Sequence, residues 1–140
     1  TAYRRQRQMC IRDRFICAPH ASQIAALYAM DCKDELNSNM SVYKENRKLM
    51  IKGLKEAGFS KISSPDGAFY IYADINKFCN DSLGFANKVL EDAKVAITPG
   101  LDFDPKNGHS TIRFSYARST EDIIRGLDKL NIFMKNNKYI

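Results

Sequence analysis

The sequence that decides the fold is TIRFSYA, residues 111–117. Its alternation puts Ile112, Phe114 and Tyr116 on one face of a β-strand, because successive side chains of a strand point to opposite faces. Arg113 and Ser115 fall on the other face. An apolar strand face must be buried against other elements, so this stretch predicts a sheet with helices packed on it.

The segments before this strand predict its partners. Three further short strands are indicated at residues 61–63, 68–75 and 95–98, because each segment has a strand-forming composition and a turn next to it. Between the last two, an amphipathic stretch predicts a helix with Asp81 or Ser82 as its N-cap, connecting them by a right-handed crossover. The expected fold class is therefore α/β, with helices packed on a small mixed sheet.

Three more stretches have helical periodicity. The last follows Ser119, a suitable N-cap, and its apolar stripe is Ile123, Leu127, Leu130 and Met134. The longest runs to Gly58, a good helix stop, and its predicted stripe is Leu36, Met40, Tyr43, Arg47, Met50, Leu54 and Ala57. A short helix beginning near Ser22 precedes it and is expected to pack against a larger body.

Composition predicts one globular domain and says little about partners. The chain has 140 residues, of which 44% are apolar, and a net charge of +6. Residues 1–14 contain five arginines and one aspartate and so hold four of these charges. That segment lacks periodicity, and we interpret it as a non-native or disordered extension or as a genuine basic arm. The remainder is nearly balanced, so the overall charge does not indicate a nucleic-acid partner.

The cysteines and histidines predict no metal site. Cys10, Cys17, Cys32 and Cys79 form no CxxC pair, and His20 and His109 are far apart. Free thiols in a reducing cytoplasm are favoured over a disulfide framework. No apolar run reaches the roughly 18 residues of a membrane span, and polar residues interrupt the one stretch that resembles a signal peptide, although an arginine-rich transit peptide stays open.

Arg113 is the candidate functional residue. A guanidinium within a strand of aromatic and β-branched residues is costly unless an anion meets it, and its planar fork matches a carboxylate. The alternatives are that Arg113 lies on a solvated strand face or pairs with Asp102 or Asp104. His109, in the turn-rich loop before the strand, is either an acid-base group or a side chain with a structural hydrogen bond.

A second pattern has two interpretations. The stretch DGAFYIY, residues 66–72, partly matches the glycine-aromatic strand of RNA-recognition motifs, whose exposed rings stack on bases. It lacks the leading basic residue and the second glycine, and its rings serve equally well as the two faces of a core strand. A core strand is the preferred interpretation.

Several motifs in register resemble the closing domain of class I/II, fold-type I aminotransferases of the aspartate aminotransferase type. They are PDGAFY (65–70), VAITPG (95–100), Phe103, Gly108 and IRFSYA (112–117), with CAP (17–19) and SQIAAL (22–27) upstream. The resemblance covers nearly everything after Arg14. It implies a large-domain tail at 15–35 and a small C-terminal domain at 36–140, with a long interdomain helix.

The resemblance also implies a function and a missing part. In this family the arginine matched by Arg113 binds the substrate α-carboxylate while pyridoxal 5'-phosphate mediates amino transfer between an amino acid and a 2-oxo acid. The family's Schiff-base lysine is expected upstream of Phe15, so the chain alone is expected to be inactive. A cytoplasmic homodimer is implied for the full-length enzyme. The alternatives are an aminotransferase-like effector domain of a transcription regulator and, less favoured, a free-standing RNA-binding module.

Overall fold

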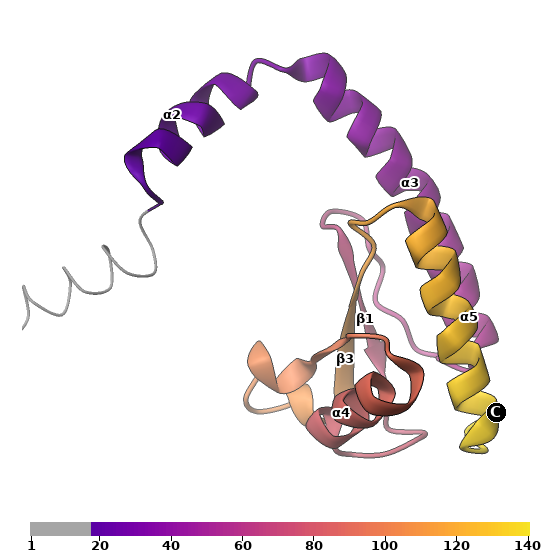
Figure 1. Cartoon of the computed structure of the whole chain (residues 1–140). Helices are drawn as coiled ribbons and strands as arrows, with labels where there is room; N and C mark the ends of the chain where they lie inside the picture. Colours follow the sequence, from indigo (N-terminus) through magenta and orange to yellow (C-terminus); the bar gives the residue numbers. More distant parts are fainter. Residues whose placement is uncertain (1–17) are drawn as a thin grey trace, which may run out of the picture. The chain divides into compact units, whose positions relative to one another are not determined.

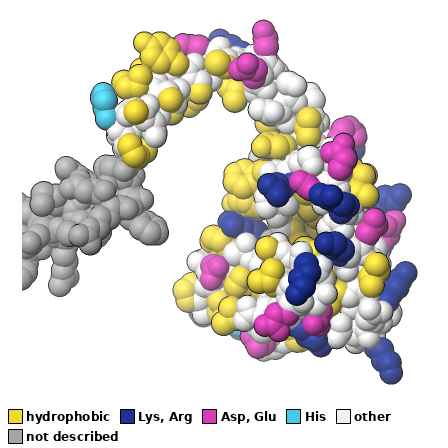
Figure 2. All heavy atoms as spheres, viewed as in Figure 1, with side chains coloured by type: hydrophobic (Ala, Val, Ile, Leu, Met, Phe, Trp, Pro, Cys, Tyr) yellow, Lys and Arg dark blue, Asp and Glu magenta, His cyan; other side chains and the backbone are white. Residues whose placement is uncertain are grey.

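The computed structural model describes residues 18–140, and the predictions for Cys10, Cys17 and the basic segment lie outside this range. The chain divides into two compact units, one ending at Ser38 and one running from Asn39 to Ile140. In the first unit, helix α2 (His20–Ala29) confirms the short predicted helix. None of its residues is buried, and Figure 2 shows hydrophobic side chains gathered over it.

A three-stranded sheet forms the centre of the second unit. It comprises β1 (Tyr70–Asp74), β2 (Thr98–Pro99) and β3 (Thr111–Ser115), in the order β1-β3-β2. The α/β class is confirmed, but the expected mixed pairing is not found in the described residues, where both strand pairs are antiparallel. The reason is that β3 enters between β1 and β2, so the two strands joined through the crossover helix are not neighbours.

Two predicted strands are shorter in the structure. Segment 61–63 contributes a single bridge, between Ile62 and Ala73, and segment 95–98 is a strand only from Thr98. Both segments lie at the edges of the sheet and pair with a neighbouring strand on one side only, so fewer hydrogen bonds extend them.

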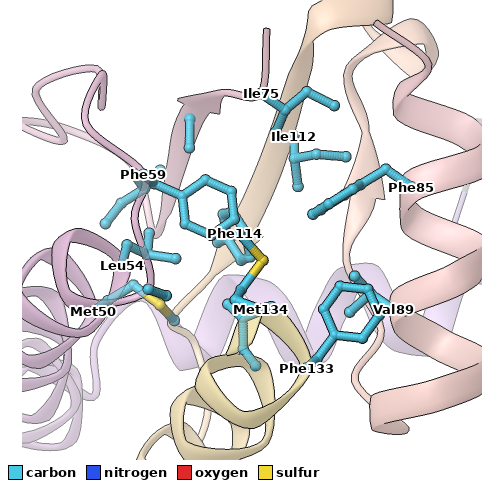
Figure 3. Close-up of a cluster of buried hydrophobic side chains, with 14 of the residues drawn as sticks. Met50, Leu54, Phe59, Ile75, Phe85, Val89, Ile112, Phe114, Phe133 and Met134 are labelled. Atoms are coloured by element: carbon cyan, nitrogen blue, oxygen red, sulfur yellow. The ribbon is translucent and has the colours of Figure 1, made fainter. Parts of the chain in front are cut away.

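Three helices cover one face of the sheet: α3 (Lys33–Glu56), α4 (Ser82–Ala93) and α5 (Thr120–Asn136). Helices α3 and α5 approach closely where Gly53 faces Leu127. Phe59 lies fully buried among their side chains, with edge-on contacts to Phe78 and Phe114 at ring-centroid distances of 5.2 and 5.4 Å. Figure 3 shows this core, to which α3, α4, α5 and β3 contribute.

The helix ends follow the sequence signals. The Asp81 carboxylate accepts a hydrogen bond from Gly84 N at 3.0 Å, and Ser119 Oγ accepts one from Asp122 N at 3.2 Å. Gly58 has a φ of 89°, the left-handed conformation that glycine tolerates at a helix end. The predicted α3 stripe is wrong at its start, because Leu36 and Met40 are exposed and burial begins further along the helix.

No helix within residues 18–140 is long and apolar enough to cross a membrane. Cys32 and Cys79 are free thiols.

Candidate functional site

Arg113 lies in the middle of β3, the central strand. Its backbone pairs with Tyr72 of β1 on one side and with Thr98 of β2 on the other. The neighbouring residues in β3, Ile112 and Phe114, are buried in the core, as their alternation predicts. Arg113 therefore projects from the opposite face of the sheet, where it is half-buried.

Two aromatic rings hold the guanidinium. Its Cζ atom lies 3.9 Å from the ring centroid of Phe103 and 5.0 Å from that of Tyr70. Tyr72 links the two rings, because its own ring contacts Tyr70 and Phe103 edge-on at ring-centroid distances of 5.7 and 6.2 Å. Cation–π attraction is strongest over a ring face, so these contacts favour one orientation of the side chain.

The loop before β3 places Phe103. Its two short 3-10 helices, η2 (Gly100–Asp102) and η3 (Gly108–Ser110), pack against each other through their glycines. A Cβ on Gly100 would lie 2.6 Å from the carbonyl oxygen of Gly108, and a Cβ on Gly108 would lie 2.3 Å from that of Gly100. Only glycine permits this approach, which closes the loop on itself and brings Phe103 over Arg113.

Neither loop aspartate neutralises Arg113. Within residues 18–140 no ion pair or side-chain hydrogen bond joins its guanidinium to another residue. Asp104 instead accepts hydrogen bonds from the backbone and side chain of Asn107 and from Lys106 N, which lower its pKa. The alternative that Arg113 pairs with Asp102 or Asp104 is therefore wrong.

His109 belongs to the same loop, in η3. Its charge acts weakly on Asp104, helping to lower the pKa of that carboxyl, and no hydrogen bond of its side chain is found in the described residues. The structure assigns it neither of its two predicted roles.

The end of β3 is fixed by a residue that the sequence analysis did not single out. Asn46, on α3, is completely buried; its Nδ2 donates to the carbonyl oxygens of Tyr116 and Arg118 at 3.1 and 2.7 Å. Its Oδ1 accepts from Thr120 Oγ1 at 2.9 Å. A polar residue within the apolar register of a helix was the available signal, and these bonds hold the connection from β3 to α5 against α3.

Tyr116 ties the other side of this connection to the turn before β1. Its hydroxyl donates to the carbonyl oxygen of Ala68, and its backbone N–H donates to that of Phe69 at 2.9 Å. Burial raises the pKa of the Tyr116 phenol, an effect that the nearby Arg47 guanidinium partly offsets. The strand that presents Arg113 is therefore anchored from two directions.

The arrangement provides a cation in contact with two aromatic rings, with its N–H groups unpaired within the described chain. Two hollows of about 540 and 640 Å³ lie elsewhere in residues 39–140, and Arg113 lines neither. A group that meets Arg113 would approach the sheet face itself. The chemistry that fits is a small planar anion that takes two parallel hydrogen bonds, as a carboxylate does.

Residues 4–130 match the family described as aminotransferase class I and II. The chain belongs to this family. The loop glycines and the central strand that form the Arg113 site lie within the matched part, so the family assignment and the site geometry concern the same residues.

Several relatives of this aminotransferase chain are known. It is 41% identical over 128 residues to valine–pyruvate aminotransferase of Mycobacterium tuberculosis, covering 89% of this chain and 33% of that protein. It is 38% identical to (5-formylfuran-3-yl)methyl phosphate transaminase of Methanocaldococcus jannaschii, covering 86% and 32%. The chain therefore spans about a third of the length of these curated relatives.

Solved structures agree with the fold. An aminotransferase-like protein from Silicibacter pomeroyi is 57% identical and superposes with a TM-score of 0.80 over 94% of this chain and 36% of its own. An aminotransferase from Mycobacterium tuberculosis is 38% identical, with a TM-score of 0.78 over 97% and 36%.

The family implies pyridoxal phosphate in its full-length members. Lys33 and Lys44 lie exposed on α3, outside the sheet that carries Arg113. The one unpaired cation built into the sheet, Arg113, has the geometry for a carboxylate. No step through the cofactor is derived from these residues.

Proposed function

We propose that this aminotransferase chain forms the small, closing domain of a pyridoxal-phosphate-dependent enzyme that transfers an amino group between an amino acid and a 2-oxo acid. In this proposal Arg113 binds the α-carboxylate that both substrates share. The observation that supports it is the half-buried guanidinium in contact with the rings of Tyr70 and Phe103, with no acidic partner in residues 18–140.

The physical argument is one of pre-organisation. An arginine whose orientation is already favoured by ring contacts loses less side-chain entropy when it binds a carboxylate, and two charge-assisted hydrogen bonds then orient the substrate about its Cα. Domain closure over the substrate would also exclude water from the reacting atoms. We place the tail end of the large domain at residues 15–35 and the small domain at residues 36–140.

The remaining parts of the proposal follow from the family. Pyridoxal phosphate, when bound, supplies an electron sink for the reaction, and we place its lysine in the part of the relatives that this chain does not cover. We propose the cytoplasm and a homodimer for the full-length enzyme. Nothing in the described residues favours the regulator or the RNA-binding alternative.

The test uses the full-length enzyme encoded by the intact gene. Arg113→Gln removes two charge-assisted hydrogen bonds, so kcat/KM for the amino acid and for the 2-oxo acid should both fall by about 10²–10³-fold. Arg113→Lys keeps the charge and loses the planar guanidinium, so its kcat/KM should lie between those of Arg113→Gln and the wild type.

Arg125→Gln is the matched control, because Arg125 is an exposed arginine on α5 paired with Asp122. It should keep wild-type kinetics. The proposal is wrong if Arg113→Gln and Arg125→Gln leave the same kcat/KM.

A further inference from the structure

We infer that Phe103 and Tyr70 are positioning residues for Arg113, the arginine proposed to bind the carboxylate. The two rings are called the aromatic clamp, and because Phe103 belongs to the loop before β3, the clamp depends on that loop. The inference rests on the proposed function.

The first step is the geometry of the clamp. Phe103 and Tyr70 are both within cation–π range of the Arg113 Cζ, at 3.9 and 5.0 Å from their ring centroids. Tyr72 contacts both rings edge-on, so the two members of the clamp support each other through a third ring. Both rings contact the guanidinium, while its N–H groups make no ion pair or hydrogen bond within residues 18–140 and are the groups that a carboxylate would meet.

The second step is that the clamp comes from two separately built elements. Tyr70 stands on β1, whose pairing with β3 fixes it relative to Arg113. Phe103 stands on the loop, and the contact between Gly100 and Gly108 sets the path of that loop. The two rings therefore meet Arg113 only when the loop has its folded shape, so the loop controls the orientation of a residue ten positions away.

The third step is the size of the effect. The clamp is half-exposed, and a cation–π contact of this kind is worth about a fivefold to thirtyfold change in an equilibrium constant. The clamp acts on Arg113 before and during the reaction, so its loss should weaken substrate binding and transition-state binding alike. We expect a raised KM with little change in kcat.

The kinetic test compares variants of the full-length enzyme. Phe103→Leu should raise KM for the amino acid and the 2-oxo acid by about tenfold and leave kcat within about twofold, whereas Phe103→Tyr, which keeps the ring, should resemble the wild type. The control is Phe69→Leu: the Phe69 ring is 52% exposed against 47% for Phe103, and it contacts Tyr70 rather than Arg113. Equal effects of the two leucine variants would overturn the inference.

A double variant separates this inference from the function it rests on. If Phe103 acts through Arg113, Phe103→Leu should cost nothing further in an Arg113→Gln background. An undiminished cost there shows that Phe103 acts by another route and overturns the inference alone. If Arg113→Gln itself leaves KM and kcat unchanged, the proposed function fails first.

A spectroscopic readout needs no activity. In the 140-residue chain, the Arg113 Nε–H lies beside two ring faces and should show a shielded proton resonance in nitrogen-edited NMR spectra. Phe103→Leu should move this resonance downfield, and Phe69→Leu should leave it in place. An Arg113 resonance that is the same in Phe103→Leu and in the wild type would show that the clamp does not form.

Discussion

Replacing Asn46 by alanine should destabilise the fold more than its size suggests. The side chain is fully buried and makes three hydrogen bonds, two to backbone carbonyls after β3 and one with Thr120 Oγ1. Alanine would leave the Tyr116 carbonyl without its buried donor, at a cost of about 1–3 kcal/mol. The two part-buried partners, which water can reach, add about 0.5–1.5 kcal/mol each, and the better helix propensity of alanine returns a few tenths.

The expected loss in the free energy of unfolding is therefore about 1.5–5.5 kcal/mol. Urea unfolding of the 140-residue chain, followed by far-UV circular dichroism, measures it. Asn87→Ala is the matched control, because Asn87 is an exposed asparagine within helix α4. That control should be neutral or slightly stabilising. A loss below about 1 kcal/mol for Asn46→Ala would refute the reasoning that these bonds anchor the end of β3.

Two further predictions concern the loop before β3 and Tyr116. Gly100→Ala places a Cβ 2.0 Å from Thr111 Oγ1 and 2.6 Å from the Gly108 carbonyl oxygen, so it should lower the free energy of unfolding by about 1–3 kcal/mol and lower Tm. The control Gly126→Ala, whose Cβ would meet nothing within 4 Å, should raise Tm, and equal changes in Tm for the two variants would contradict the prediction. Burial raises the pKa of Tyr116 above 10.0, so the neutral phenol stabilises the fold below that pH and this contribution is lost as the pH rises through the folded pKa. An alkaline absorbance titration should show one late phenol that Tyr116→Phe removes, and its persistence in that variant would be inconsistent with the assignment.

Local patterns predicted the elements that have strong local signals. The alternation in 111–117 identified the strand, its buried face and Arg113 on the other face, and the caps Asp81 and Ser119 marked helix starts correctly. Strand direction was not predictable in the same way. Pairing is set by which strands meet in space, and the insertion of β3 between β1 and β2 depends on the path of the whole chain.

The place of Arg113 on a strand was predictable and its surroundings were not. The guanidinium on a strand indicated an anion-binding role, yet the stacking of Phe103 depends on a loop closure that no periodicity encodes. Sequence proximity suggested Asp102 or Asp104 as partners of Arg113. Asp104 instead satisfies its carboxylate within its own turn, as aspartates in loops often do.

Strand β3 contributes to the core with one face and presents Arg113 on the other, because its side chains alternate. Ile112 and Phe114 are buried among the helices at a packing density that tolerates little movement, so the backbone between them is held in place. Arg113 lies on that backbone, and its side chain projects from the opposite face of the strand. A substitution in the core beneath β3 should therefore reach Arg113, the arginine for which we propose carboxylate binding, through the position of the strand.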